Sequence, residues 1–264
     1  MSQDILDQAG RVSLVTGAGQ GVGRQIALHL SGHNSGGVAV NDYVLERAES
    51  VADEIKAAGG KAIAVQADVT DTESVKAMVA RINDELGPVG TLINNAGNMG
   101  ANPTADVMKP FWETGPDVWS QSIDVNLFGV MNCTAAVIPG MIERKAPARV
   151  VTIISDAARH GDAGFEAYSA AKAGAAGFMR SLARSTARFQ VTANCIAISA
   201  TRTPAIAAQL ANEALMKKVL SNYIVRRPGE PEDVANMALF LASEASSWIS
   251  GHTYPVDGGF VPSL

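Results

Sequence analysis

A glycine-rich turn near the N-terminus constrains the fold of this chain more than any other stretch. Val12 to Thr16 is a short apolar run with β-branched residues, which predicts a buried strand. Arg24 to Leu30 has the apolar spacing of a helix, and between the two lies Gly17-Ala18-Gly19-Gln20-Gly21-Val22-Gly23. A strand, a glycine turn and a helix in this order present backbone N–H groups and a helix N-terminus to an anion. The turn predicts a phosphate-binding site, with a glycine turn that binds no ligand as the alternative.

Strands and helices alternate along the rest of the chain. Further strands are predicted at Gly37–Asn41, Ala62–Gln66, Thr91–Asn94, Val150–Ser155, Val191–Ala197 and Thr253–Val256. Helices are predicted at Leu45–Ala58, from Thr70 or Asp71 to Leu86, and at Val118–Met141, Phe165–Phe189, Ala205–Leu220 and Glu232–Ala242. This alternation predicts an α/β fold: a doubly wound, Rossmann-like parallel sheet of about seven strands, with helices on both faces and right-handed crossovers. Because no linker or shift in composition interrupts the pattern, residues 1–264 are predicted to form a single domain.

Composition and charge exclude several classes of function. The net charge is -5 and no block of like charge occurs, which argues against nucleic acid as a partner. The N-terminus lacks the basic and apolar regions of a signal peptide, and no apolar run reaches about 18 residues, so no membrane partner is expected. Cys133 and Cys195 lie in apolar surroundings, which predicts buried thiols and a cytoplasmic protein. Histidines and cysteines do not have metal-ligand spacing, so no metal is predicted.

The stretch from Ser155 to Lys172 carries the candidate chemistry. Tyr168 and Lys172 are one helical turn apart, so a helix places both side chains on one face. A free phenol has a pKa of about 10, and a nearby ammonium shifts that pKa down towards the range of a useful base. Ser155 ends the preceding strand, where its hydroxyl can hold a substrate oxygen. The set suits proton transfer to or from an alcohol or carbonyl oxygen, and an ordinary surface pair is the alternative reading of Tyr168 and Lys172.

Asp42 lies at the end of the second predicted strand. A carboxylate there accepts hydrogen bonds from a ribose diol and repels a 2′-phosphate. Neither Arg nor Lys follows within four residues, and position 20 is Gln20 rather than a basic residue. The sequence therefore favours NAD as cofactor, with NADP less favoured, and capping of the next helix is the alternative role for Asp42.

Taken together, these segments resemble the short-chain dehydrogenase/reductase family over nearly the whole chain. The glycine turn has the family spacing T-G-x-x-x-G-x-G, not G-x-G-x-x-G. The remaining residues that carry the resemblance are Asn94-Asn95-Ala96-Gly97, Asn126, Ser155, Tyr168-x-x-x-Lys172 and Val256-Asp257-Gly258-Gly259. The resemblance implies a hydride transfer between NAD(H) and a secondary alcohol or ketone.

The resemblance also implies a role for each matching catalytic residue. Tyr168 would be the general acid/base that exchanges a proton with the substrate oxygen. Lys172 would lower the pKa of Tyr168 and bind the nicotinamide ribose, and Ser155 would orient and polarise the substrate oxygen. Asn126 would hold a water that passes the proton on beyond Lys172.

Cofactor contacts are implied in the same way. Gly17, Gln20, Gly21, Val22 and Gly23 would surround the pyrophosphate. Asp42 would bind the adenosine ribose, Asp68 and Val69 would flank the adenine, and Asn95, Ala96 and Gly97 would line the path to the nicotinamide. Many family members have Pro-Gly where this chain has Ile198-Ser199, a turn that covers the nicotinamide side of the cofactor. Thr203 still matches the residue that meets the carboxamide.

Substrate choice is expected in segments 98–117, 156–167 and 198–222. Their apolar residues predict an apolar pocket, although such residues also serve helix packing; they are Met99, Phe111, Trp112, Phe165 and Ile206. Three basic residues in the same segments suggest an anionic group on the substrate, such as a carboxylate or the phosphates of a coenzyme A thioester, with a solvated face as the alternative: Arg159, His160 and Arg202. Alicyclic, steroid-like and acyl-CoA-linked alcohols remain open.

The family resemblance leaves two further expectations and two alternatives. A homo-oligomer, tetramer or dimer, is expected through the helix that contains Asn126 and the small-residue helix from Ala167 to Ala187. A non-catalytic protein that senses NAD is the main alternative, although such a protein needs none of the proton chemistry of Tyr168. An epimerase or an enoyl reductase on the same fold is the other alternative.

Overall fold

The computed structural model describes residues 4–97, 106 and 109–262. In that part of the chain, seven strands form one sheet in the order β3-β2-β1-β4-β5-β6-β7, and every neighbouring pair is parallel. The strands are β1 (Val12–Val15), β2 (Gly37–Asp42), β3 (Ala62–Gln66), β4 (Val89–Asn94), β5 (Ala148–Ser155), β6 (Val191–Ile198) and β7 (Thr253–Val256). The predicted doubly wound sheet is confirmed, and the strand order reverses between β1 and β4.

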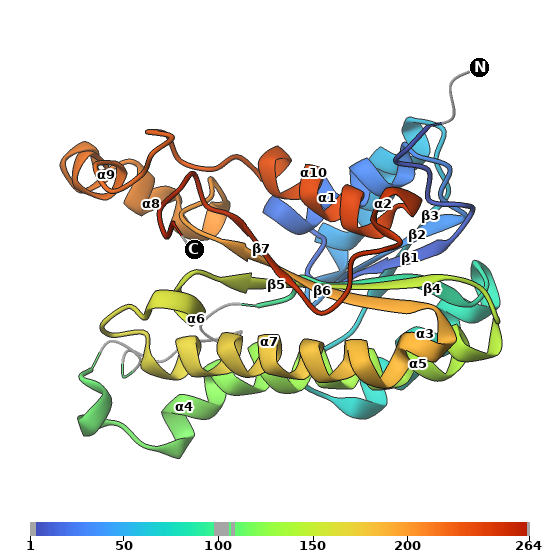
Figure 1. The fold of residues 1–264 in the computed structure, drawn as a ribbon, viewed down its shortest axis with the longest axis horizontal. Helices are drawn as coiled ribbons and strands as arrows, with labels where there is room; N and C mark the ends of the chain where they lie inside the picture. The colour runs from blue at the N-terminus through green and yellow to red at the C-terminus, as the bar shows by residue number, and fades with distance from the viewer. Residues whose placement is uncertain (1–3, 98–105, 107–108, 263–264) are drawn as a thin grey trace.

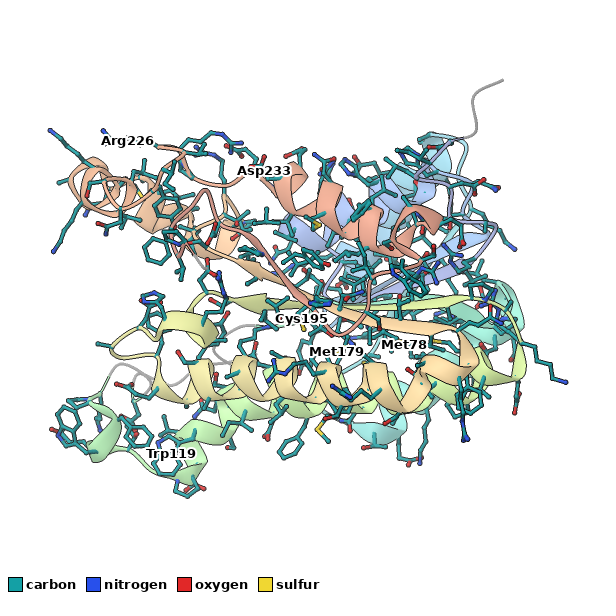
Figure 2. The ribbon with its side chains drawn as sticks, viewed as in Figure 1. Met78, Trp119, Met179, Cys195, Arg226 and Asp233 are labelled. Atoms are coloured by element: carbon teal, nitrogen blue, oxygen red, sulfur yellow. The ribbon has the colours of Figure 1, made fainter. Side chains whose placement is uncertain are left out.

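Helices cover both faces of the sheet (Figure 1). One face carries α1 (Gly21–Ser31), α2 (Leu45–Ala57) and α10 (Pro231–Ala242), and the other carries α3 (Thr72–Glu85), α5 (Gly129–Glu143) and α7 (Glu166–Thr186). Each layer encloses its own buried apolar cluster, because strands of a parallel sheet are apolar on both faces. Met78, Met179 and Cys195 lie in the cluster between the sheet and α3, α5 and α7 (Figure 2).

The structure departs from the predicted helices in three places. The helix expected at Val118–Met141 begins earlier and is interrupted: α4 (Pro116–Ile123) leads into a π-helical turn, η3 (Asp124–Phe128), before α5. The helix expected at Ala205–Leu220 is broken into η5 (Pro204–Ile206), α8 (Ala207–Leu210) and α9 (Glu213–Leu220). A short helix, α6 (Ala157–His160), stands where a loop was expected. Apolar spacing locates helices but carries little information about where their hydrogen-bond pattern changes.

The continuous helical stretch Pro116–Glu143 is long and apolar enough to cross a membrane by length and composition. Core helices of soluble proteins meet the same criterion, so this observation alone is weak. Its most apolar window is only 39% buried within the described structure. Part of this apolar helix is therefore left uncovered by the residues that the structure describes.

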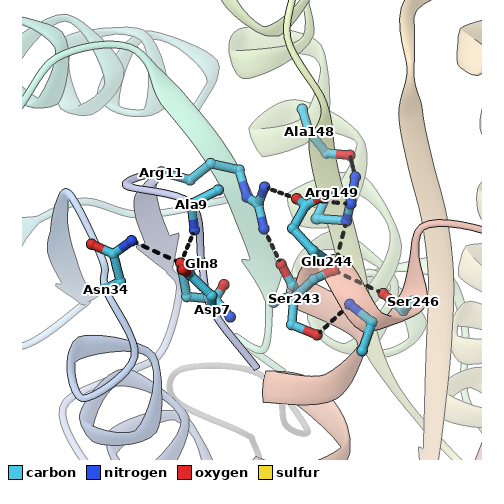
Figure 3. Close-up of polar contacts among 12 residues, drawn as sticks. Asp7, Gln8, Ala9, Arg11, Asn34, Ala148, Arg149, Ser243, Glu244 and Ser246 are labelled. Carbon is cyan, nitrogen blue, oxygen red and sulfur yellow. Dashed lines mark hydrogen bonds and ion pairs between the residues drawn. The ribbon is translucent and has the colours of Figure 1, made fainter. Parts of the chain in front are cut away.

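Two buried arginines tie the ends of the chain together at the N-terminal edge of the sheet (Figure 3). Arg149, at the start of β5, donates to the Ser243 carbonyl at 3.2 Å and to Glu244 at 3.2 Å. Arg11, just before β1, donates to the same Glu244 carboxylate and to the Ala242 carbonyl at 2.7 Å. This network anchors the segment after α10 at the edge opposite to the candidate site.

Candidate active site

The predicted cofactor residues come together in one cavity of about 690 Å³ at the C-terminal edge of the sheet. It opens beside the point where the strand order reverses, which is where ligands bind in doubly wound sheets. Every residue predicted to contact the cofactor lines this cavity: Gly17, Gln20, Gly21, Val22, Gly23, Asp42, Asp68, Val69, Asn95, Ala96, Gly97, Tyr168, Lys172, Ile198 and Thr203. Residues from six predicted segments of the chain thus meet in space, as the resemblance implies.

The glycine turn has a shape that other residues cannot adopt without strain. Gly17 and Gly21 have φ values of 61° and 56°, in the left-handed region that favours glycine. A Cβ at position 23 would lie 2.3 Å from the Gly17 carbonyl oxygen, which is far inside van der Waals contact. A Cβ at position 17 would lie 2.8 Å from Ala96 Cα. The turn therefore requires glycine at these three positions, as in the strand–turn–helix cradles whose backbone N–H groups bind the phosphates of a dinucleotide.

A reciprocal clasp holds this turn against the loop after β4. The Thr16 hydroxyl accepts hydrogen bonds from the backbone N–H groups of Asn95 at 3.1 Å and Ala96 at 3.0 Å. In return, the Asn95 side-chain amide donates to the carbonyls of Thr16 and Gly17, each at 2.9 Å. Asn95 therefore braces the glycine turn with its side chain, in addition to lining the cavity.

Asp42 is buried at one end of the cavity and binds backbone rather than a neighbouring cation. Its carboxylate accepts from the N–H of Gly19 at 2.9 Å and from the N–H of Val44 at 3.0 Å. Arg47, on the exposed side of α2, lines the same end, and its stem lies over Gly19. Sequence reasoning missed Arg47 because it searched only four residues beyond Asp42, whereas the first turn of α2 brings the fifth residue back to the cavity.

Tyr168 and Lys172 project from the first two turns of α7 towards the end of β5. Lys172 is 4% exposed, and its Nζ donates to the Ile153 carbonyl at 2.9 Å. The same Nζ lies 5.9 Å from the centroid of the Tyr168 ring. Helical spacing therefore brings phenol and ammonium together as predicted, and both line the cavity.

The pKa of Tyr168 shifts in the direction opposite to the one predicted. Burial raises the pKa of the phenol above its ordinary value, and a hydrogen bond with Ser155 lowers it by less. Burial also lowers the pKa of Lys172 to about 8. The Lys172 ammonium donates its hydrogen bond to the Ile153 carbonyl and lies 5.9 Å from the centroid of the Tyr168 ring. Burial therefore affects the pKa of the phenol more than the ammonium does.

Asn126 occupies the π-helical turn η3, a kind of irregularity that occurs often at functional sites. Its side chain is fully buried, and Nδ2 donates to the Ser122 carbonyl at 2.8 Å. A Cβ at position 97 would lie 2.6 Å from Asn126 Oδ1 and 2.8 Å from Lys172 Nζ. Gly97 therefore leaves room for the Asn126 and Lys172 side chains to approach one another beside the cavity.

Aromatic side chains lie next to Tyr168 on the substrate side. The Phe165 ring meets the Tyr168 ring edge to face at 6.0 Å between centroids, and Phe111 stacks on Trp119 at 4.8 Å. Met99 lies outside the described residues, as does most of the first half of segment 98–117.

Arg159, His160 and Arg202, the basic residues singled out in the substrate segments, each have an acidic neighbour within the chain. Arg159 binds Asp156 at 2.7 Å, His160 lies 3.2 Å from Asp162, and Arg202 binds Glu230 at 3.0 Å. An anionic substrate group would therefore compete with these acids for the same side chains. Within the described residues, no group of three or more His, Cys, Asp or Glu side chains could hold a metal ion.

A doubly wound sheet with a glycine cradle, and a hydroxyl, a phenol and an ammonium beside it, defines a nucleotide-dependent oxidoreductase. Comparisons with known proteins agree. The family model described as enoyl-(acyl carrier protein) reductase matches residues 17–261. The chain belongs to the short-chain dehydrogenase/reductase family.

Two relatives and two solved structures illustrate the activities found among similar proteins. The 7alpha-hydroxysteroid dehydrogenase of Escherichia coli is 33% identical over 100% of this chain and 99% of its own. A solved structure of a 7 alpha-hydroxysteroid dehydrogenase with NADH and 7-oxo glycochenodeoxycholic acid is 32% identical, covers 100% and 99% of the two chains, and has a TM-score of 0.91. The 3-oxoacyl-(acyl-carrier-protein) reductase of Staphylococcus aureus is 37% identical over 94% of this chain and 96% of its own. A gluconate 5-dehydrogenase from Burkholderia cenocepacia, solved with NADP and tartrate, is 27% identical, covers 99% of each chain and has a TM-score of 0.90. Membership of this family makes the chain an oxidoreductase that transfers a hydride between an alcohol and a ketone.

Proposed function

We propose that this protein is an NAD-dependent dehydrogenase/reductase of secondary alcohols and ketones, with Tyr168 as its general acid/base. One observation carries the proposal: the residues predicted to contact the cofactor line a single cavity that also receives Tyr168 and Lys172. When bound there, the nicotinamide would supply or accept the hydride. The residues of this chain supply position and proton transfer.

Each catalytic side chain has a task that follows from its surroundings. Because burial raises the pKa of Tyr168, the phenol is protonated at neutral pH and suited to donate a proton to a carbonyl oxygen. The Ser155 hydroxyl, which hydrogen-bonds Tyr168, orients the same substrate oxygen. When an alcohol is oxidised, Tyr168 must give up its phenolic proton before it can accept the proton of the substrate hydroxyl. The Lys172 ammonium and the buried amide of Asn126 lie along the route proposed for this proton.

The preference for NAD rests on Asp42. Its buried carboxylate faces the cavity and would repel a 2′-phosphate, whereas Arg47 at the same end would attract one. Arg47 is exposed to solvent, so its attraction is screened more than the repulsion from Asp42. We expect kcat/KM with NAD to exceed kcat/KM with NADP about tenfold or more. The substitution Asp42→Asn is expected to lower this ratio. Equal values for both cofactors in the wild type would remove this part of the proposal.

The substrate is proposed to be an alicyclic or steroid-like alcohol. Aromatic rings at Phe111, Trp119 and Phe165 offer apolar surface beside Tyr168, and the similarity to a 7alpha-hydroxysteroid dehydrogenase points to the same class. An acyl-CoA substrate is less favoured because Arg159, His160 and Arg202 each have an acidic neighbour in the chain itself.

A spectrophotometric screen tests the reaction class and the substrate class together. Secondary alcohols, hydroxysteroids and hydroxyacyl-CoA esters are each offered with NAD and with NADP, and reduced cofactor is followed by absorbance. An enoyl thioester with reduced cofactor tests the activity in the description of the family model. Tyr168→Phe is the control, since it removes only the phenolic oxygen. Turnover that survives this substitution would contradict the role of Tyr168, and cofactor binding without any turnover would favour the sensing alternative.

The uncovered outer face of η3 and α5 supports a homo-oligomer. Phe128 is 49% exposed and Met131 is 38% exposed, an unusual exposure for large apolar side chains that lie close together. Gly174 and Gly177 lie on α7, the helix beside them, where small residues permit close helix packing. Light scattering after size exclusion is expected to give a dimer or tetramer, and Met131→Glu is expected to lower that mass. A monomeric wild type would refute the expectation.

A further inference from the structure

Two buried carboxylates lie directly behind the end of β5. Asp156 follows Ser155 in the chain and is 2% exposed, and Asp257 follows β7 and is 9% exposed. Arg159 of α6 lies between them, with Nη1 2.7 Å from Asp156 Oδ1 and 3.6 Å from Asp257 Oδ2. Its Nη2 also donates to the Val261 carbonyl at 3.3 Å. One guanidinium therefore joins the catalytic strand end to the C-terminal segment.

Two buried carboxylates face a single guanidinium in this junction. The second oxygen of Asp156 accepts no hydrogen bond from the residues that the structure describes. Ionisation of Asp156 is therefore disfavoured both by its burial and by the neighbouring carboxylate of Asp257. Burial raises the pKa of Asp156, the hydrogen bond from Arg159 lowers it, and the charge of Asp257 raises it again.

The C-terminal segment 257–261 is built around the same Asp257. Its carboxylate accepts from the N–H of Gly259 at 2.8 Å and from the N–H of Val261 at 3.1 Å. The Phe260 ring, held between these two contacts, meets the His160 ring of α6 edge to face at 5.2 Å and the Tyr223 ring at 5.0 Å. The segment thus fills the space between α6 and the residues that follow α9.

Tyr223 links the Phe260 ring to the loop after β6. Its hydroxyl hydrogen-bonds Ser199 Oγ and accepts from the N–H of Ala200 at 3.1 Å. This loop leads to Thr203, and it is the turn in which the chain has Ile198-Ser199 where many family members have Pro-Gly. Contacts from the C-terminal segment therefore support a turn that lacks the rigidity of proline.

We propose that Arg159, with Asp156 and Asp257, is a positioning group that fixes Ser155 and the loop after β6 for hydride transfer. The inference rests on the proposed function, and it adds residues that touch neither substrate nor cofactor. Ser155 is held on both sides: its Oγ accepts from the N–H of Ala157 at 3.2 Å, and the N–H of Asp156 donates to the Ile198 carbonyl at 3.0 Å. A loosened Arg159 would release α6 and the C-terminal segment from this strand end.

Protonation of Asp156 gives the junction a pH dependence of known sign. Asp156 faces Arg159 from α6 and Asp257 from the segment after β7, while His160 of α6 is directed to Asp162. Because the pKa of Asp156 is raised in the folded protein, the folded state binds this proton more tightly than the unfolded chain. The stabilisation is complete below the ordinary value of 3.8 and is lost as pH rises through the raised pKa.

Substitutions at Arg159 and Asp156 test the proposal in the full chain. Arg159→Met keeps the length of the stem and is expected to lower kcat about tenfold or more while KM for NAD changes less than twofold. Asp156→Asn keeps the size of the side chain and removes its titrating carboxyl group. It is expected to retain at least half of kcat and to flatten the dependence of Tm on pH above about 4. Arg184→Met is the matched control, since Arg184 is exposed on α7 and has no ion pair within the described structure.

The outcomes separate this inference from the proposed function. A wild type without dehydrogenase activity refutes the proposed function, whereas the Tm–pH profile of Asp156→Asn still reports on the junction. Equal kcat in wild type and Arg159→Met refutes the positioning role. If Arg159→Met does not fold, Arg159→Lys replaces it, and a folded lysine variant with wild-type kcat refutes the role equally. A Tm–pH profile unchanged in Asp156→Asn refutes the pH dependence assigned to Asp156.

Discussion

The hydroxyl of Thr16 is the smallest group on which the cofactor cradle depends, and Thr16→Val removes it without changing the size of the side chain. In the wild type this oxygen accepts from the backbone N–H groups of Asn95 and Ala96 at 3.1 Å and 3.0 Å. Thr16 is 1% exposed, so the methyl group that replaces the hydroxyl leaves no cavity and admits little water. In the variant, the backbone N–H groups of Asn95 and Ala96 face a methyl group and lose their acceptor.

The expected cost follows from those two donors. A buried N–H without a partner costs about 1–3 kcal/mol, so two would cost about 2–6 kcal/mol. Asn95 and Ala96 are half-buried, and water can reach part of this surface, so we expect the free energy of unfolding to fall by about 2–4 kcal/mol. Thr16→Ser keeps the hydroxyl and loses one buried methyl group, which costs about 1 kcal/mol.

Urea denaturation measures both variants under the same conditions, and titration with NAD measures cofactor affinity. The Asn95 side chain also holds the Thr16 and Gly17 carbonyls, so the valine variant is expected to weaken NAD binding as well as stability. The serine variant should bind NAD like the wild type. A valine variant no less stable than the serine variant would refute the reasoning, because the hydrogen bonds to the Thr16 hydroxyl would then contribute nothing to the free energy of unfolding.

Three further substitutions probe other parts of the molecule. Gly97→Ala places a methyl group 2.6 Å from Asn126 Oδ1 and 2.8 Å from Lys172 Nζ. Because both side chains must then move, kcat in steady-state assays should fall about 100-fold. A variant with the kcat of the wild type would contradict this geometry. Lys172→Met removes a buried amine whose pKa is lowered from 10.5 to about 8, so the wild type loses stability as pH falls from 10.5 to about 8. The stability of the variant relative to wild type should therefore decrease between pH 8 and 10.5 in urea titrations, and a constant difference would argue against burial of the charge. Glu244→Gln removes the carboxylate that the two buried arginines Arg11 and Arg149 share, and should lower the free energy of unfolding in urea by about 1–3 kcal/mol. This cost is smaller than for a fully buried ion pair because the Glu244 side chain is 43% exposed. An unchanged free energy of unfolding would mean that backbone carbonyls satisfy both arginines.

Local pattern was sufficient to predict the sheet and the cavity. Runs of β-branched residues mark the strands, and the carboxyl ends of parallel strands meet at one edge, so residues just after each run are brought together. That is why Asp42, Asn95 and Thr203, far apart in sequence, line the same cavity. The π-helical turn around Asn126 was not predictable in this way, since apolar spacing continues through it unchanged.

Charge partners and titration were beyond the reach of the sequence. Arg159 was interpreted as a group for an anionic substrate, yet it donates to the carbonyl of Val261, 102 positions further along the chain. Arg47 lies one residue outside the segment in which a basic neighbour of Asp42 was sought. The pKa of Tyr168 was expected to fall because of Lys172, and burial raises it instead.

The sequence by itself determined the class of fold, the glycine cradle and the set of side chains that can exchange a proton with an alcohol. Each of these follows from short-range periodicity or from backbone conformations that only glycine adopts readily. The tertiary structure alone decided which acids compensate which bases, how deeply each ionisable group is buried, and how the C-terminal segment braces Ser155. Electrostatic energies depend on distance and on the surrounding dielectric, and both are set by chain segments that meet only after folding.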